Sequence, residues 1–396
     1  MPLGLRRGAV TAVVERLEGL VRLEVDGIPC IAFPRLTGDV EQGDDVLVND
    51  QARLLELGSG GFDVLYANLT RGLGLSPEEG AHVMALPYTP GQATVRYEEE
   101  ARELAASLDG LPVVLCTVHS QVAPVCGGLA GRRVAYAQVA GGALPVSLSD
   151  TVRTLKRRGL VGIAGAVAPC LDGDAHFVSS AAAMAWARAE GYEAVVCSVG
   201  PGIVGTASRL GHGALSLAEA ANVATAVGGR PVLAVRTLKE RGLVEITCAV
   251  APCIDAERQF VTVAAALAWA AAEGFGAVVC SVGPGIVGTG SRLGHGALTL
   301  ADAANTAAAL GGRPILAVRM SAADARERHR GVSHHARAVL DLALAAVAVP
   351  PDEDGDGWEQ ACAGLPLSHM GRGPEEDESF FRAAYAAGVA ARRLLP

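Results

Sequence analysis

The chain has 396 residues, half of them hydrophobic, and a formal net charge of −9 at pH 7, which is enough apolar material for two or three domains. The acidic balance argues against a nucleic-acid partner, because phosphate backbones are bound by clustered Lys and Arg. Nine cysteines without a C-x-x-C pair exclude a disulfide framework and favour a reducing compartment. The apolar pattern indicates neither a membrane span nor a signal peptide, so the sequence predicts a cytoplasmic protein.

The first 70 residues are predicted to form a small β-barrel-like domain. Short alternating segments such as LVRLEV (20–25) and IPCIAF (28–33) are typical of strands, and Asp26-Gly27 between them indicates a tight hairpin. Residues 71–111 are rich in Pro and Gly at first and are predicted to be a linker. This linker ends in a helix over 97–108.

From residue 112 to residue 349, short apolar strands alternate with helical segments. Strands are predicted over 112–118 and 133–139, and a helix over 150–159. This alternation predicts an α/β domain with a mostly parallel, doubly wound sheet that helices cover on both faces. Residues 350–396 are expected to form an acidic linker and a C-terminal helix.

The α/β region contains a tandem duplication. Residues 154–236 recur without a gap as residues 237–319, an offset of 83 positions with 61 identities. Each copy is predicted to supply a strand, a helix, a strand that ends in a Gly-rich loop, a second helix and a final strand. We interpret one copy as an insertion, and we expect a protein that lacks 237–319 to fold.

The second helix of each copy has clear end signals. Ser216 with Glu219, and Thr299 with Asp302, fit the capping box in which a Ser or Thr side chain caps the helix. Paired glycines at 228–229 and 311–312 indicate where each helix ends.

The Gly-rich loop GPGIVG follows a predicted strand in both copies and is a candidate anion site. Backbone N–H groups of such loops can bind phosphate, and ligands of α/β sheets bind beyond the carboxyl ends of the strands. The alternative is a loop shaped by packing alone, and the central Pro argues against a dinucleotide site. The candidate ligand-binding residues are Gly283, Gly285, Gly288, Ser291 and Arg292. His212 and His295, each in a G-H-G segment, are interpreted as loop histidines hydrogen-bonded to the backbone.

A second candidate site is the polar segment MSAADARERHRGVSHH, residues 320–335. Arg326 and Arg328 are predicted to clamp an anion, and the candidate catalytic residues for proton transfer are His119, His334 and His335. The alternative is a solvated helix start. Neighbours on a helix diverge, so we expect that His334 and His335 cannot face one point. Metal coordination by His119, Asp324 and one of this pair stays open, and the sequence names neither a metal nor a cofactor.

Several segments together resemble a known bacterial family. They are VGPGIVGTGSRLG, GGRPILAVR, RERHRGVSHHARAVL, HVMALPYTPGQ, CTVHSQ and LSHMGRGPEEDESFF. They are similar to the domain of unknown function 3866. The resemblance covers nearly all of the chain except one repeat copy. It implies a cytoplasmic bacterial protein with a small β domain and an α/β domain, and it implies no known activity.

Two hypotheses follow for the function. The first is an enzyme that acts on a small anionic or phosphorylated molecule through the Gly-rich loop and the Arg/His segment. The alternative is a non-catalytic ligand sensor or a structural scaffold. Both are consistent with a small anionic ligand and with a homo-oligomer, and neither needs a nucleic acid or a membrane.

Overall fold

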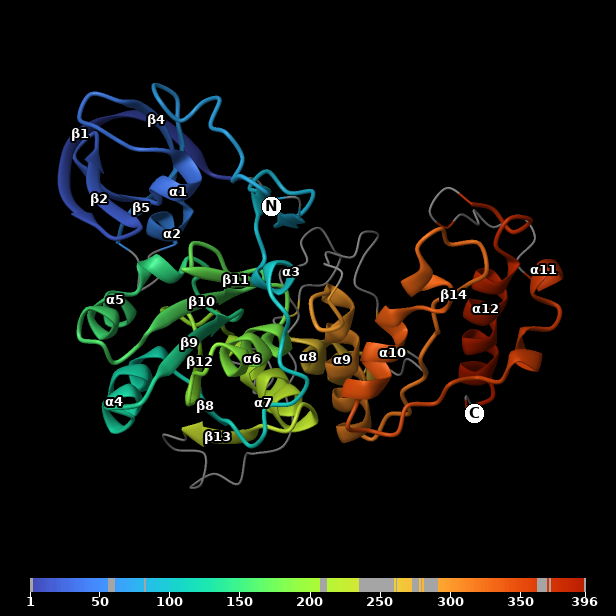
Figure 1. Cartoon of the computed structure of the whole chain (residues 1–396). Coiled ribbons are helices and arrows are strands. Elements are labelled where there is room, and N and C mark those ends of the chain that lie inside the picture. The colour runs from blue at the N-terminus through green and yellow to red at the C-terminus, as the bar shows by residue number, and fades with distance from the viewer. Residues whose placement is uncertain are drawn as a thin grey trace.

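The protein is described by a computed structural model in which a β-barrel, an α/β domain and a group of C-terminal helices follow one another (Figure 1). The α/β class and the N-terminal barrel are therefore confirmed. The described residues are 3–55, 61–81, 83–206, 212–234, 260, 262–272, 278, 280, 291–361, 369 and 372–394.

Five strands close the N-terminal barrel in the order β1-β2-β3-β5-β4, with β3 and β5 parallel and the other pairs antiparallel. Inward residues such as Val10, Leu23 and Val48 fill its interior. The predicted hairpin is confirmed, since Asp26 and Gly27 both have positive φ. The barrel elements are β1 (Leu5–Leu17), β2 (Leu20–Val25), β3 (Ile28–Ala32), α1 (Pro34–Thr37), β4 (Asp45–Asn49), α2 (Gln51–Leu54) and β5 (Asp63–Asn68).

The predicted linker, residues 71–111, contains a β-hairpin that its sequence did not indicate, and its end is less helical than predicted. A two-stranded hairpin joins β6 (Val83–Ala85) to β7 (Ala93–Val95), and α3 (Glu98–Ala101) is the only helical turn within 97–108. The predicted longer helix is therefore wrong. After α3 the backbone N–H of Leu108 bonds to the carbonyl of Val227 instead, because contact with the α/β domain outweighs local helix propensity.

Six parallel strands form the central sheet in the order β11-β10-β9-β12-β8-β13. Successive residues alternate between its faces: Val134 and Tyr136 pack on the side of α4 and α5, while Ala135 and Ala137 pack on the side of α6 and α7. The strands are β8 (Pro112–Cys116), β9 (Val134–Val139), β10 (Ile163–Val167), β11 (Ala175–Phe177), β12 (Ala194–Val199) and β13 (Arg230–Ala234). The helices are α4 (Val122–Gly128), α5 (Asp150–Arg157), α6 (Ser180–Ala189) and α7 (Ser216–Ala226).

The second repeat copy extends one face of this domain. Its helices α8 (Val263–Ala272) and α9 (Thr299–Ala309) lie beyond α7, and α10 (His334–Leu342) packs against both α7 and α9 (Figure 1). Leu298, Ala301 and Val339 join the hydrophobic core that α6 and α7 form on the sheet. The second copy's predicted strands EITCAVA (245–251) and AVVCSV (277–282) fall almost wholly outside the described residues.

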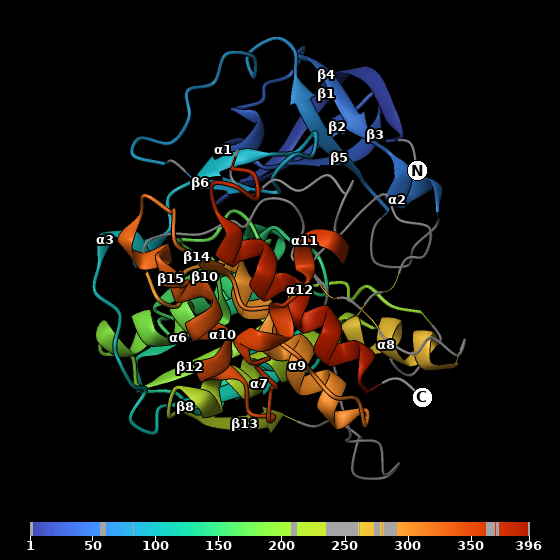
Figure 2. The same cartoon turned by 90° about the vertical axis from the view of Figure 1, so that its right-hand side faces the viewer.

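The last predicted strand of copy two, PILAVR (314–319), is wrong. It forms only an isolated parallel bridge between Ile315 and Ala348. The C-terminal elements are β14 (Met320–Ser321), β15 (Gly331–Val332), α11 (Trp358–Ala361) and α12 (Glu378–Arg392). Turned by 90°, the molecule shows α9, α10 and α12 in front of the sheet (Figure 2). None of the described helices has the length and apolar character needed to cross a membrane.

The helix ends of the two copies are only partly as predicted. Gly228 and Gly311 have positive φ and follow α7 and α9, as expected for C-terminal stops. Both capping boxes are wrong, because neither helix has a side-chain cap. The hydroxyl of Ser216 donates to the carbonyls of Ala140 and Gly213, and that of Thr299 donates to the carbonyl of Gly296. A short 3-10 turn before each helix supplies its start instead.

Candidate functional site

Helix α10 presents two adjacent histidines at its first turn. Its N-cap is Ser333, whose hydroxyl oxygen accepts from the backbone N–H of His335, and His334 and His335 are the first two helical residues. Their rings lie 4.3 Å apart between centroids, so the expectation that adjacent histidines must diverge is wrong. The Cα–Cβ bonds of a helix tilt toward its N-terminus, and at the first turn two neighbouring side chains can both reach the space beyond the helix end.

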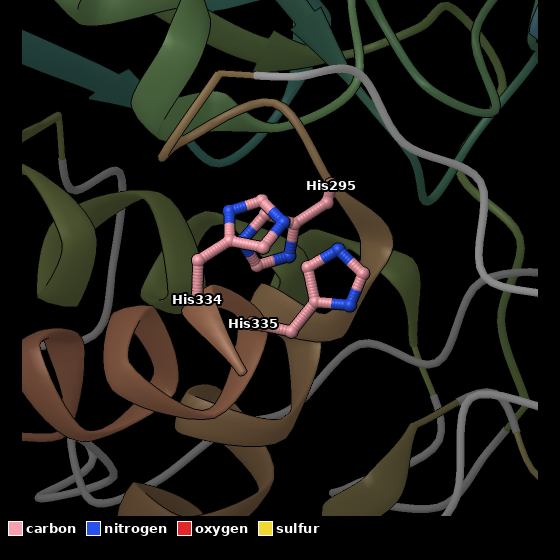
Figure 3. A group of neighbouring side chains, drawn as sticks. All are labelled: His295, His334 and His335. Carbon is pink, nitrogen blue, oxygen red and sulfur yellow. The ribbon is translucent and has the colours of Figure 1, made fainter. Parts of the chain in front are cut away.

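His295 from the second repeat copy enters the same space. It precedes a 3-10 turn (Gly296–Leu298) in extended backbone, and its side chain is completely buried. Its ring centroid lies 5.2 Å from that of His334 and 4.3 Å from that of His335. One nitrogen from each of the three rings can be chosen so that all lie within 4.8 Å of one another. Figure 3 shows the three rings converging from the loop and from α10.

A fourth histidine, His329, packs against this group. It ends a 3-10 turn (Glu327–His329), and its ring centroid is 4.8 Å from those of both His334 and His335. Its Nδ1 lies 2.8 Å from the hydroxyl oxygen of Ser333. This oxygen already accepts from Arg319 and from the backbone of His335, so its own hydrogen is left to donate to Nδ1. We call His295, His329, His334 and His335 the histidine cluster.

The histidine cluster is uncharged near neutral pH. Burial, and then the positive charge of neighbouring rings and arginines, lowers the pKa of every member. The pKa falls to about 3 for His295, about 4 for His329, about 4 for His334 and about 2 for His335. Neutral imidazoles keep a lone pair that can accept a proton or bind a cation.

Several ring nitrogens in the histidine cluster are buried without a partner among the described residues. They include both nitrogens of His295, Nε2 of His334 and Nδ1 of His335. His295 therefore lies in a loop as predicted, while the geometry of its ring shows no hydrogen bond to the described backbone. Buried polar atoms are nearly always hydrogen-bonded, so three such rings at one point indicate a site for a ligand.

Asp324 holds the segment that carries His329 and α10. Its carboxylate is almost completely buried and pairs with Arg319 at 2.7 Å, with Arg326 at 3.1 Å and with Arg372 at 3.7 Å. The hydrogen bond to Arg326, together with the other arginines, holds the pKa of this carboxyl well below its usual range. Arg326, a predicted anion clamp, thus already has a carboxylate partner. Arg328, the other predicted clamp, is exposed and has no side-chain partner among the described residues.

The C-terminal region completes this support. Asp377 accepts from the hydroxyl of Ser321 at 2.6 Å and pairs with Arg372, and His369 stacks on Phe380. These contacts fasten the His-bearing segment to α12. Sequence reasoning missed His295 and Asp377 as parts of the site. The signal for His295 was present, since it stands in the segment that diverged least between the two copies.

His119 lies apart from the histidine cluster. It begins a 3-10 turn after β8, its Nε2 is 2.6 Å from the hydroxyl oxygen of Ser149, and its ring packs on Tyr136. Burial lowers the pKa of His119. It does not join His295, His334 and His335 in the group that the described residues form.

The Gly-rich loop can be described only in the first copy. There it packs closely against the loop after β9: a Cβ on Gly200 would lie 2.0 Å from the carbonyl oxygen of Ala143, and one on Gly213 would lie 1.9 Å from that of Gly141. Glycine at these positions permits close backbone approach. Gly283, Gly285 and Gly288 lie outside the described residues. Of the other predicted ligands, Arg292 pairs with Asp341 of α10 at 3.2 Å, and the hydroxyl oxygen of Ser291 is 3.4 Å from the backbone N–H of Leu293.

A family model described as "Protein of unknown function (DUF3866)" matches the chain over residues 29–237 and 233–362. The two matches together span most of the chain, and they overlap near the junction of the two repeat copies. None of the curated proteins matches.

Proposed function

The chain belongs to the DUF3866 family of proteins of unknown function, and from this premise we propose that it is an enzyme acting on a small anionic molecule at the histidine cluster. The observation that carries the proposal is the convergence of three uncharged imidazoles, one buried and two partly buried, in a segment with an exposed arginine. An uncharged imidazole has a lone pair that can accept a proton or bind a cation, and a guanidinium group is the side chain best suited to a carboxylate or phosphate.

Charge around the cluster supports an anionic substrate. After burial, the positive charges of Arg328, Arg319, Arg326 and Arg337 are the causes that lower the pKa of His334. Arg319 and Arg326 share the carboxylate of Asp324 with Arg372, whereas Arg328 and Arg337 are exposed. Positive charge therefore exceeds negative charge around His334, and its exposed part would attract an anion.

The test begins with ligand binding. Thermal unfolding of the purified chain is measured with inorganic phosphate, sugar phosphates, nucleotides and dicarboxylates. A ligand present at a hundred times its dissociation constant stabilises the native state by about 2.7 kcal/mol, which raises the unfolding temperature measurably. Arg328→Ala is expected to weaken the response to the anion that binds, and Arg132→Ala, which removes an exposed arginine paired with Glu193, is the matched control.

Turnover separates an enzyme from a sensor. An anion that binds is incubated with the chain, and its conversion is followed by mass spectrometry. The proposal expects conversion by the wild type that His334→Gln abolishes. Binding without conversion would instead support the non-catalytic sensor, and no response to any anion would contradict both.

A further inference from the structure

We propose that His295, His334 and His335 bind one divalent transition-metal cation, of the class that includes zinc and cobalt, through one ring nitrogen each. The inference rests on the proposed function for its choice of site and adds a cofactor to it. Imidazole is a preferred ligand of these ions, and three protein ligands with an open position are typical of catalytic zinc sites.

The positions of the three rings are close to those of a metal site. With metal–nitrogen bonds of about 2.0–2.1 Å, tetrahedral geometry separates ligand nitrogens by about 3.4 Å. The nitrogens here already lie within 4.8 Å of one another, so rotation of the rings about their side-chain bonds can close the remaining gap (Figure 3). Two of the rings start from the fixed first turn of α10, and the third starts from the extended residue before a 3-10 turn.

Hydrogen bonding within the protein leaves these rings unsatisfied. His295 is completely buried, and neither of its ring nitrogens has a hydrogen-bond partner among the described residues. The same holds for Nε2 of His334 and Nδ1 of His335. A buried polar atom without a partner destabilises the protein, and four such atoms lie in these three rings. A single cation would bind one lone pair from each ring and offset most of that cost.

The neighbours of the three rings support their placement. Ser333 holds the backbone of His335 and, through the same hydroxyl, the Nδ1 of His329. His329 therefore has a hydrogen-bond partner of its own, and its ring packs against those of His334 and His335 on α10. Metal-binding histidines are usually held in this way by surrounding hydrogen bonds and packing.

Charge balance connects the metal to the anionic substrate. Three neutral imidazoles leave the charge of a divalent cation uncompensated, and the buried carboxylate of Asp324 is already paired with arginines. The open position would therefore favour an anion, in line with the exposed Arg328. The cation and this arginine would bind one anionic group from two sides.

The test uses zinc and cobalt alone as probes. The full chain is treated with a chelator, dialysed against Zn²⁺ or Co²⁺ and freed of excess ion. Bound metal is then measured by mass spectrometry, and the cobalt form by visible absorption, which is intense for four-coordinate cobalt. We expect one ion per chain and an intense cobalt spectrum. Metal content at the level of a protein without a site would overturn the inference.

Substitutions locate the ion. His295→Ala is expected to weaken zinc binding at least about a hundredfold, because loss of even a supporting group costs ten- to a hundredfold. The matched control is His212→Ala, which changes the equivalent histidine of the first copy in the same GHGAL segment. If His295→Ala does not fold, His335→Gln tests the same ligand set at the surface of α10. Equal affinity in wild type and variants, or equal loss in the His212 control, would contradict the proposed ligands.

The proposed metal site and the proposed anionic substrate can be tested separately. Arg328→Ala is expected to weaken phosphate binding while the cobalt spectrum stays unchanged. Phosphate binding that survives complete removal of metal, in a chain that takes up no zinc, would overturn the metal site and leave the proposed function standing. Stoichiometric zinc without any anion response would do the reverse.

Discussion

The two repeat copies carry the same GHGAL segment in two different surroundings. His212 and His295 have nearly the same extended backbone, with φ of −140° and −150°, and each leads into a 3-10 turn and an 11-residue helix. In copy one the segment packs on the loop after β9, through Gly141 and Gly213. In copy two it meets α10 and completes the histidine cluster.

The residues that follow each repeat copy decide what its GHGAL segment contacts. The segment from Met320 to His335 occurs once, directly after copy two, and supplies His329, His334 and His335. Only one of the two GHGAL histidines can therefore meet it in the described structure. Copy one contributes β12 and β13 to the central sheet instead, so its role is to build the domain.

The largest loss of stability is expected from substitution of Asp324. This residue holds the segment 320–335, which follows copy two and has no counterpart after copy one. Asp324→Ala leaves three arginines without their shared carboxylate, and Arg319 and Arg372 are mostly buried. Breaking a buried ion pair in this way costs about 3–5 kcal/mol. We expect the free energy of unfolding in urea to fall by that amount. Asp45→Ala, which breaks an exposed pair with Arg7, is the control and is expected to cost about 0–1 kcal/mol.

A substitution in copy one tests the other half of the comparison. Gly213→Ala places a Cβ 1.9 Å from the carbonyl oxygen of Gly141, and neither backbone can move without displacing the ends of β9 and α7. Overpacking of this kind costs about 1–3 kcal/mol, and so close an approach of two backbones places the cost at the upper end of that range. The control, Gly127→Ala in α4, meets open space and is expected to stabilise the protein by about 0.5–1 kcal/mol. Equal stability of the two variants in urea would show that the copy-one loop is not packed as described.

Sequence reasoning predicted the parts of the fold that depend on local pattern. The barrel hairpin at Asp26-Gly27, the strand–helix alternation and the glycine stops at 228 and 311 are all present. It failed where distant contacts decide. The helix expected over 97–108 is replaced by backbone bonds to the α/β domain, and Ser216 turns away from its helix to bond Ala140.

In the candidate site, too, the features set by local sequence were predicted and those set by distant contacts were not. The polar segment 320–335 was identified from its composition, because dense Arg and His after an apolar stretch are a local signal. The low divergence of the GHGAL segment marked both of its histidines, but which of the two joins the polar segment could not be decided from local sequence, because the two GHGAL segments are identical. The convergence of His334 and His335 was missed because helix periodicity describes the middle of a helix and not its first turn.

A smaller change in stability, one that depends on pH, is expected from two acidic residues at equivalent positions of the two copies. Burial raises the pKa of Glu219 on α7 to about 7, and burial together with the charge of Glu219 raises that of Asp302 on α9 well above its usual value. A carboxyl group whose pKa is raised by folding stabilises the protein when protonated. This contribution is complete below its unfolded pKa, and it is lost as pH rises through about 7.

We therefore expect the free energy of unfolding to fall between about pH 5 and about pH 7.5, by on the order of 1–3 kcal/mol. Glu219→Gln keeps the shape of the side chain without its charge and is expected to flatten this decline. Exposed Glu103→Gln is the control and is expected to leave the decline unchanged. If the pH profiles of wild type and Glu219→Gln coincide, the acidic pair does not couple the two copies.

The smallest effect is expected where copy two touches α10 at the surface. Arg292 pairs with Asp341 at 3.2 Å, and both side chains are about half exposed. Such a pair contributes about 0–1 kcal/mol and is screened by salt. Asp341→Asn is therefore expected to lower the free energy of unfolding by less than about 1 kcal/mol, and less still in 1 M NaCl. A much larger, salt-independent loss would mean that this pair, and not the buried core around Leu298 and Val339, holds α10 against copy two. The position of His334 and His335 beside His295 would then depend on a surface contact that the first copy has no opportunity to make.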